Sequence, residues 1–163
     1  MKNRFIFAVA IFVATLVAAF FFNKYKVAPA IKFETLDLTD IEERKISLDS
    51  FQNKKLFINF FATWCGPCLR ELPSILEAQQ KLSKEKIQFI LISDEPLGKL
   101  IYFNEQTGGQ FTVLHSEKSL QQYKIYSIPT SYLLNSGHEI IFKKTGEENW
   151  CDEKMLKRFR EAE

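Results

Sequence analysis

Apolar residues recur along the chain at spacings that predict a mixed α/β domain. Residues 56–61 form a short aromatic and aliphatic run, which is typical of a buried strand. Residues 69–82 carry apolar side chains every three or four positions, which predicts an amphipathic helix. A second buried strand is predicted at residues 87–92, and a second helix at 96–107. The two buried runs favour a parallel pair of strands at the centre of a sheet.

The flanking segments add a hairpin on each side of this centre. A polar turn at residues 40–44 separates two alternating runs and predicts an N-terminal β-hairpin. Asn135-Ser136-Gly137 predicts the turn of a second hairpin. The remaining predicted segments are strands at 33–38 and 45–48, a strand at 111–114, a helix at 117–123, strands at 132–134 and 139–143, and a final helix at 149–161. The inward face of that final helix carries Trp150, Met155, Leu156 and Phe159.

An uncharged stretch at residues 5–22 precedes the domain, and Thr15 is its only polar residue. As a helix it would be about 27 Å long, close to the thickness of a bilayer's hydrocarbon core. We therefore expect a transmembrane anchor at 5–22, a cytoplasmic N-terminus at 1–4, a linker at 23–30 and one domain at 31–163. A cleaved signal peptide is the alternative, because Ala28-Pro29-Ala30 offers a small-residue cleavage site.

The charge balance excludes a strongly basic or acidic domain. Removing Lys2 and Arg4 from the 22 basic residues leaves 20, against 20 acidic ones. The basic residues near the C-terminus, including Lys157 and Arg158, are explained by a solvated helix end. We therefore expect no nucleic-acid partner.

Five consecutive residues at the predicted strand-to-helix junction carry the candidate chemistry. They are Trp64-Cys65-Gly66-Pro67-Cys68. Cys65 would lie at the helix N-terminus, where unpaired N–H groups and the helix dipole favour a thiolate, so we expect it to be the attacking sulfur. Cys68 lies one turn further, within bonding reach of Cys65, so it can resolve a mixed disulfide.

A zinc site and a purely structural disulfide fit the cysteine pair less well. Zinc needs two more ligands, but Cys151, His115 and His138 are scattered and form no second ligand pair. A structural disulfide across so short a loop would stabilise the fold little. We interpret Cys151 as a small packed side chain, His138 as a turn residue and His115 as the end of a strand.

With these motifs the chain resembles thioredoxin over roughly residues 33–160. Pro73 matches the proline inside the active-site helix of that fold, where it is expected to kink the helix. Ser127-Ile128-Pro129-Thr130 resembles the loop whose cis proline faces the dithiol and presents backbone groups to an extended substrate. The resemblance implies a substrate-binding surface at Trp64, Ile128 and Pro129, although from sequence alone a trans proline would be the commoner state.

Within that superfamily, residues 60–73 resemble the exported TlpA/ResA-like thiol-disulfide oxidoreductases. Asn59 stands where thioredoxin has a buried aspartate, and it cannot titrate at ordinary pH. Glu71 matches the acidic residue that ResA-like proteins carry after the second cysteine. It shares a helix face with Cys68, so it could move protons and raise the pKa of a nearby thiol. The alternative is an ordinary solvated glutamate.

The resemblance implies a thioredoxin fold with an N-terminal hairpin extension, a central insertion and helices on both faces of the sheet. It also implies an enzyme tethered outside the cytoplasmic membrane that exchanges dithiol and disulfide at Cys65 and Cys68 without a cofactor. Disulfide-containing exported proteins, among them apocytochrome c, would be its substrates. A membrane thiol-disulfide electron donor would have to regenerate the dithiol.

Three further functions remain as alternatives. A copper chaperone on the same fold would use C-x-x-x-C with a distant histidine, whereas this spacing is one residue shorter. A peroxiredoxin-like peroxidase would need a threonine-containing loop around a single attacking cysteine, which this sequence lacks. A pure interaction module would leave the dithiol idle.

Overall fold

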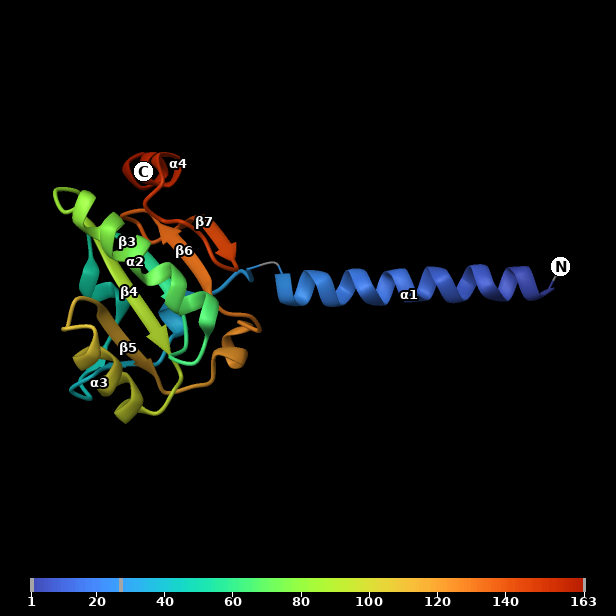
Figure 1. Cartoon of the computed structure of the whole chain (residues 1–163), viewed down its shortest axis with the longest axis horizontal. Helices are drawn as coiled ribbons and strands as arrows, with labels where there is room; N and C mark the ends of the chain where they lie inside the picture. Colours follow the sequence, from blue (N-terminus) through green and yellow to red (C-terminus); the bar gives the residue numbers. More distant parts are fainter. Residues whose placement is uncertain (1, 27, 163) are drawn as a thin grey trace.

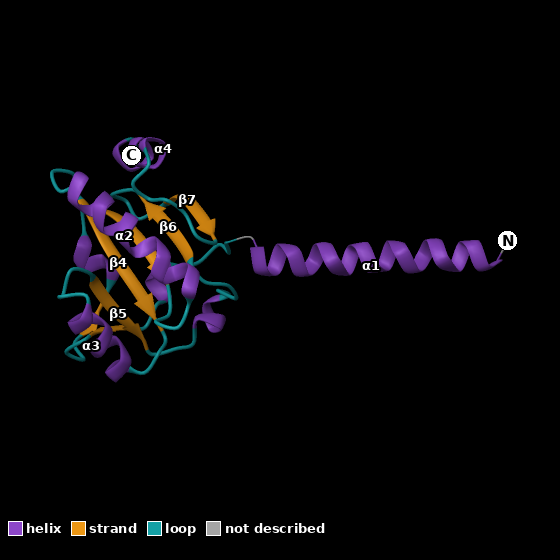
Figure 2. Ribbon diagram, in the orientation of Figure 1, coloured by secondary structure: helices purple, strands orange, loops and turns teal. Residues whose placement is uncertain are grey.

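A seven-stranded mixed sheet forms the centre of the computed structural model, which describes residues 2–26 and 28–162 (Figures 1 and 2). The side chains of residues 2, 3, 5 and 22–26 lie outside the description. In chain order the elements are α1 (Lys2–Lys26), η1 (Phe33–Thr35), β1 (Leu38–Asp40), β2 (Lys45–Ile46), η2 (Leu48–Phe51), β3 (Lys55–Phe60), α2 (Gly66–Lys81), β4 (Ile87–Ser93), α3 (Leu97–Gln106), β5 (Thr112–Ser116), η3 (Leu120–Tyr123), β6 (Thr130–Leu134), β7 (Ile140–Thr145) and α4 (Glu153–Arg160).

The strand order β2-β1-β5-β4-β3-β6-β7 places β3 and β4 side by side at the centre of the sheet. They run parallel, as expected for two buried strands joined by a helix, and β4 also pairs in parallel with β5. On its other side, β3 pairs antiparallel with β6. The predicted thioredoxin-like α/β fold is confirmed. Strand β5, which follows α3, pairs with β1 of the N-terminal hairpin and with β4, and so connects the hairpin to the centre of the sheet.

Apolar side chains form one core on each face of the sheet. On β3, Leu56, Ile58 and Phe60 face one core, whereas Phe57 faces the other. Helices α2, α3 and α4 pack on the Phe57 side of the sheet. The residues that were predicted to face inward near the C-terminus are all buried there, namely Trp150, Met155, Leu156 and Phe159. The opposite core is closed by the three short 3-10 helices and the segment before β1. Helices on both faces were predicted, but the α-helices of the domain pack on one face only.

Several predicted boundaries were wrong for local reasons. Residues 33–35 form a 3-10 turn, so the first hairpin strand begins at Leu38. Residues 117–123 do not form an α-helix. They contribute only η3, because the backbone of Ser119 is extended (φ −61°, ψ 143°) and helical geometry begins after it; the end at Tyr123, before the left-handed Lys124 (φ 66°), is where it was predicted. The final helix begins at Glu153 instead of residue 149, because the Asp152 side chain caps it by accepting a hydrogen bond from the Met155 N–H.

The N-terminal stretch forms the continuous helix α1, drawn in Figure 1 apart from the domain. Among the residues that the structure describes, no helix is both long and apolar enough to cross a membrane, so the predicted membrane crossing is not confirmed. Two residues of the predicted linker at 23–30 contact the domain. Ala28 is buried in the core, and the Pro29 carbonyl accepts a hydrogen bond from the Tyr132 hydroxyl at 2.9 Å.

Candidate active site

The two cysteines lie where β3 gives way to α2, and they are joined by a disulfide with 5.2 Å between their Cα atoms. Cys65 is the N-cap of α2, and its Sγ accepts a hydrogen bond from the Cys68 N–H at 3.3 Å. An N-terminal helix position stabilises negative charge on sulfur. Cys65 is 5% exposed and Cys68 1%, so Cys65 is the more accessible of the two residues in this oxidised state.

The sheet register places the proline loop beside this junction. Phe60, the last residue of β3, pairs with Thr130, the first residue of β6. Pro129 therefore lies next to the point where the chain leaves β3 for the cysteines. The Ile128-Pro129 bond is cis, as the resemblance to thioredoxin implied. Trp64, directly before Cys65, is 71% exposed, whereas Pro129 is buried.

Glu71, one helical turn after Cys68, is buried beneath the site, with 2% of its surface exposed. The interpretation of Glu71 as a solvated glutamate is therefore wrong. Its Oε1 accepts a hydrogen bond from Asn59 Nδ2 at 2.6 Å. Its Oε2 accepts hydrogen bonds from Trp150 Nε1 at 3.0 Å and from the Glu148 N–H at 3.1 Å. A buried carboxylate is tolerated when such donors satisfy it.

Burial raises the pKa of Glu71 to about 7. The loss of hydration favours the neutral acid and outweighs the three hydrogen bonds, which favour the carboxylate; the charge of nearby Glu147 adds to the rise. A carboxyl group with a pKa near neutrality can both accept and release a proton under ordinary conditions. Glu71 therefore has the acid-base property that proton transfer beside a dithiol requires.

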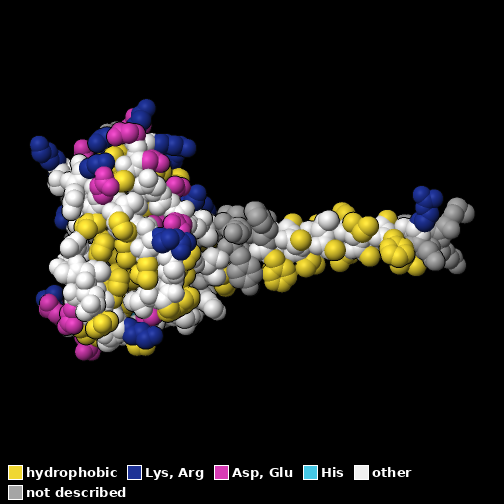
Figure 3. Space-filling model, in the orientation of Figure 1, with side chains coloured by type: hydrophobic (Ala, Val, Ile, Leu, Met, Phe, Trp, Pro, Cys, Tyr) yellow, Lys and Arg dark blue, Asp and Glu magenta, His cyan; other side chains and the backbone are white. Residues whose placement is uncertain are grey.

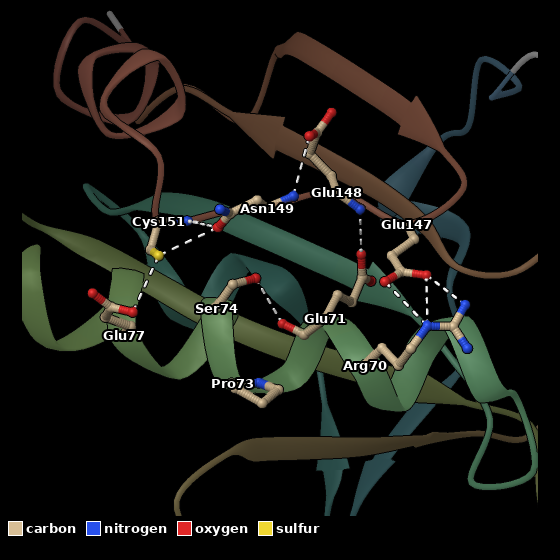
Figure 4. A pocket seen from close by; sticks show the side chains of 9 residues that line it. All are labelled: Arg70, Glu71, Pro73, Ser74, Glu77, Glu147, Glu148, Asn149 and Cys151. Atoms are coloured by element: carbon tan, nitrogen blue, oxygen red, sulfur yellow. Dashed lines mark hydrogen bonds and ion pairs between the residues drawn. The ribbon is translucent and has the colours of Figure 1, made fainter.

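A cavity of about 600 Å³ borders Glu71 and the segment that follows β7 (Figure 4). The rim is held by the Arg70–Glu147 ion pair at 2.6 Å and by Ser74 Oγ, which accepts a hydrogen bond from the Trp150 N–H. Figure 4 shows Glu71 on α2 facing the backbone of Glu148 across this space. The cavity supplies a short route by which protons could exchange between Glu71 and solvent.

Asn59 completes the surroundings of Glu71 from β3. Its Nδ2 donates to both Glu71 and Ser131 Oγ, whereas its buried Oδ1 has no hydrogen-bond partner among the residues that the structure describes. A rotation of the amide by 180° would turn Oδ1 toward Glu71 and let the protonated acid donate to it. The position that replaces thioredoxin's buried aspartate thus holds a group able to pair with Glu71 in either protonation state.

A second buried carboxylate was missed by sequence reasoning. Glu95, 6% exposed and just after β4, accepts hydrogen bonds from the Thr63 N–H and, at 2.9 Å, from Thr63 Oγ1. It therefore fixes the turn that carries Trp64 and Cys65. The available signal was topological: Thr63 and Glu95 each follow one of two parallel strands, and the ends of parallel strands meet at one edge of the sheet.

Comparison with known proteins decides the family. The Redoxin family model matches residues 24–158. The chain is 30% identical over 157 residues to the thiol-disulfide oxidoreductase ResA of Bacillus thuringiensis (strain Al Hakam), covering 90% of this chain and 91% of that protein. The chain is a ResA-like member of the Redoxin family.

Solved structures agree on the fold of this ResA-like protein. StoA from Bacillus subtilis superposes with a TM-score of 0.61 at 26% identity, over 82% of this chain and 98% of that one. A thiol:disulfide interchange protein from Chlorobium tepidum TLS gives a TM-score of 0.61 at 20% identity, over 83% and 99% of the two chains. Together with the Cys65–Cys68 pair, the relatives identify the protein as a thiol-disulfide oxidoreductase.

The third cysteine of the ResA-like protein, Cys151, is a half-buried free thiol just before α4. Its Sγ lies 3.2 Å from Glu77 Oε2 and 3.3 Å from Asn149 Oδ1, the two acceptors for its single proton. The hydrogen bond to the Glu77 carboxylate raises the pKa of Cys151, which makes it less reactive than an ordinary thiol.

The two histidines lie where the sequence placed them. His138 has a left-handed backbone (φ 62°) in the turn between β6 and β7. His115 lies near the end of β5, with its Nδ1 3.4 Å from Thr39 Oγ1 and 3.6 Å from Glu117. Among the described residues, no group of three or more His, Cys, Asp or Glu side chains is arranged to hold a metal ion.

The burial of Glu71 predicts a pH-dependent stability. A group whose pKa is raised by folding stabilises the folded state below its unfolded pKa of 4.5, and this contribution is lost as pH rises through about 7. The free energy of unfolding of the oxidised protein should therefore fall by on the order of 3 kcal/mol across that range because of Glu71.

Urea unfolding at pH 5 and pH 8 measures this effect. Glu71→Gln should remove most of the difference, whereas the control Glu85→Gln, at an exposed position, should retain it. Equal pH dependence in wild type and Glu71→Gln would show that this carboxyl does not titrate as proposed.

Proposed function

We propose that this oxidoreductase reduces disulfide bonds of exported proteins outside the cytoplasmic membrane. The observation that carries the proposal is the Cys65–Cys68 pair at the N-terminus of α2 with a buried, near-neutral-pKa carboxyl one turn behind it. An attacking thiolate and a proton carrier are the two groups that disulfide reduction needs. The Gly-Pro pair between the cysteines, shared with thioredoxin, supports the reducing direction.

The proposed reaction moves two electrons from the dithiol to the substrate. The Cys65 thiolate attacks one sulfur of the substrate disulfide, forms a mixed disulfide and releases the other substrate sulfur as a thiolate. Cys68 then loses its proton and attacks Cys65 Sγ, which releases the second substrate thiolate and closes the Cys65–Cys68 bond. Glu71 accepts the Cys68 proton, and solvent that reaches Glu71 along the cavity completes the transfer.

The proline loop and Trp64 are proposed to hold the substrate chain. Pro129 lies beside the junction that carries Cys65, and the partly buried Ile128 contacts both cores. This leaves the loop backbone placed to align an extended segment of substrate. The exposed Trp64 ring adds an apolar surface next to the attacking sulfur. Because the chain resembles ResA-like proteins, apocytochrome c is included among the proposed substrates.

We also propose that residues 5–22 anchor the protein in the cytoplasmic membrane, with residues 31–163 outside and a membrane thiol-disulfide donor as the reductant. Support comes from the sequence of residues 5–22, which carries no charge. The side chains of its two end residues, Phe5 and Phe22, lie outside the described part of the chain. The described apolar side chains of α1, such as Ile11 and Phe12, are exposed and would gain from burial in lipid.

The proposed roles of the cysteines predict different behaviour of the two serine variants. The reduced protein should reduce insulin, and Cys65→Ser should be inactive because the attacking sulfur is gone. Cys68→Ser should accumulate mixed disulfides in cells, since nothing resolves them. Alkylation of the reduced protein at neutral pH, followed by mass spectrometry, should label Cys65 first. Preferential labelling of Cys68 would reverse the two roles.

Glu71→Gln should change both the thiols and the rate. Without the carboxylate charge, which develops above pH 7, the thiol pKa values should fall by roughly one pH unit. Insulin reduction should slow by roughly a hundredfold, because the proton carrier is lost. Thiolate absorbance and insulin turnover, each measured against pH, report the two effects separately. Unchanged curves in both assays would remove Glu71 from the mechanism.

The anchor predicts that the full chain stays with the membrane pellet after an alkaline carbonate wash of bacterial cells. Replacing residues 5–22 with a cleavable secretory leader should release the domain into the soluble extracytoplasmic fraction. A membrane-impermeant thiol reagent should label the reduced protein in intact spheroplasts. Recovery of a soluble chain that begins shortly after residue 30 would instead establish a cleaved signal peptide.

A further inference from the structure

A groove between α2 and α3 runs beside the dithiol and has no part in the proposed thiol exchange. Two neighbouring cavities of about 540 Å³ and 670 Å³ share Leu69, Phe103 and Gln106 as lining residues. The apolar groove is defined by Thr63, Leu69, Leu76, Tyr102, Phe103 and Phe111. Figure 3 shows apolar side chains gathered on the face of the domain that carries α2 and α3.

We propose that the apolar groove binds aliphatic or aromatic side chains of the substrate polypeptide next to its disulfide. The proposal rests on the proposed function and deepens it by naming the class of substrate. The preferred substrates are unfolded or partly folded chains, because in folded proteins the large apolar residues beside a cysteine are mostly buried.

The position of the groove fits a chain that is already bound at Cys65. Thr63 lies two residues before Cys65, and Leu69 lies one helical turn after it, with the Leu69 N–H donating to the Cys65 carbonyl at 3.0 Å. β3 pairs with β6 on one side and with β4 on the other. The Pro129 loop precedes β6, whereas α3 follows β4, so the groove lies on the flank of the dithiol opposite the loop. A substrate segment crossing Cys65 between them would reach both.

The groove offers an apolar surface with little net charge. Tyr102 is 63% exposed and Leu69 40%, although both are side chains that gain free energy when removed from water. Lys99, which lines the end near Thr63, lies 3.7 Å from the buried Glu95 carboxylate, which offsets its charge. A neutral apolar segment is therefore the occupant whose chemistry fits best.

The wall nearest the dithiol is rigid. Both Glu95 oxygens accept hydrogen bonds from Thr63, so the turn that separates the groove from Cys65 is held in place. A wall fixed in this way keeps the groove and the attacking sulfur in constant relative position, so a bound apolar side chain would orient the neighbouring substrate sulfur. This contact links recognition in the groove to the chemistry at Cys65.

Two disulfide peptides of equal length and charge test the proposal. One carries Leu and Phe beside its cysteines and the other carries Ser at the same positions. The reduced full-length protein should have a kcat/KM about tenfold higher for the apolar peptide. Tyr102→Gln should bring the ratio of the two values close to one. Ile101→Gln is the matched control, because Ile101 is an exposed apolar residue on the same helix and does not line the groove.

The outcomes distinguish failure of the groove proposal from failure of the proposed function. A tenfold ratio that falls in Tyr102→Gln and persists in Ile101→Gln would support the groove. Equal kcat/KM values for the two peptides in an active wild-type enzyme would overturn the groove and leave the proposed function standing. An equal loss of preference in both variants would also overturn it. If the reduced protein acted on neither peptide and not on insulin, the proposed function would fail, and the groove proposal would fail with it.

Discussion

The burial of Glu71 constrains the structure around the dithiol more than any other interaction. A carboxyl group removed from water is tolerated only if donors surround it, and here they come from β3, through Asn59, and from the segment after β7, through Glu148 and Trp150. These hydrogen bonds hold α2 against the central strand and against the C-terminal part of the chain. The helix that carries both cysteines is thereby fixed at the turn directly behind them.

Trp150 both packs in the apolar core and donates a hydrogen bond to the buried carboxyl group of Glu71. Its ring is fully buried, and its centroid lies 4.7 Å from that of Phe57 on β3, in an edge-on arrangement. The same side chain donates its indole N–H to Glu71. Removing it would open a cavity in the core and leave a carboxyl oxygen with one donor fewer, so stability and acid-base chemistry depend on a single residue.

The active site occupies the edge of the sheet where the central strands end. The chain leaves β3 into the cysteine motif, leaves β4 into the turn that carries Glu95, and enters β6 from Pro129. These three points supply Cys65, the Glu95 side chain that supports the Thr63 turn, and the proline loop. α3 forms one side of the apolar groove because it follows β4 directly. The topology therefore brings together the groups that are proposed to bind, orient and react, although they are distant in sequence.

The sequence alone determined those features that depend on local chemistry. It placed the cysteine pair at a strand-to-helix junction, located β4 and α2 to within a few residues, and identified the inward face of the last helix, because each follows from side-chain periodicity and helix-end preferences. The cis proline came from the resemblance to thioredoxin, not from periodicity.

Only the tertiary structure decided the surroundings of those groups. The position of Glu71 one turn after Cys68 left its burial open, because the residues that enclose it, such as Trp150, lie as far as 79 positions away in the chain. The contact between Glu95 and Thr63 depends on the pairing of β3 with β4. Local patterns fix which helices and strands form, but the environment of a side chain depends on which distant segments the sheet brings beside it.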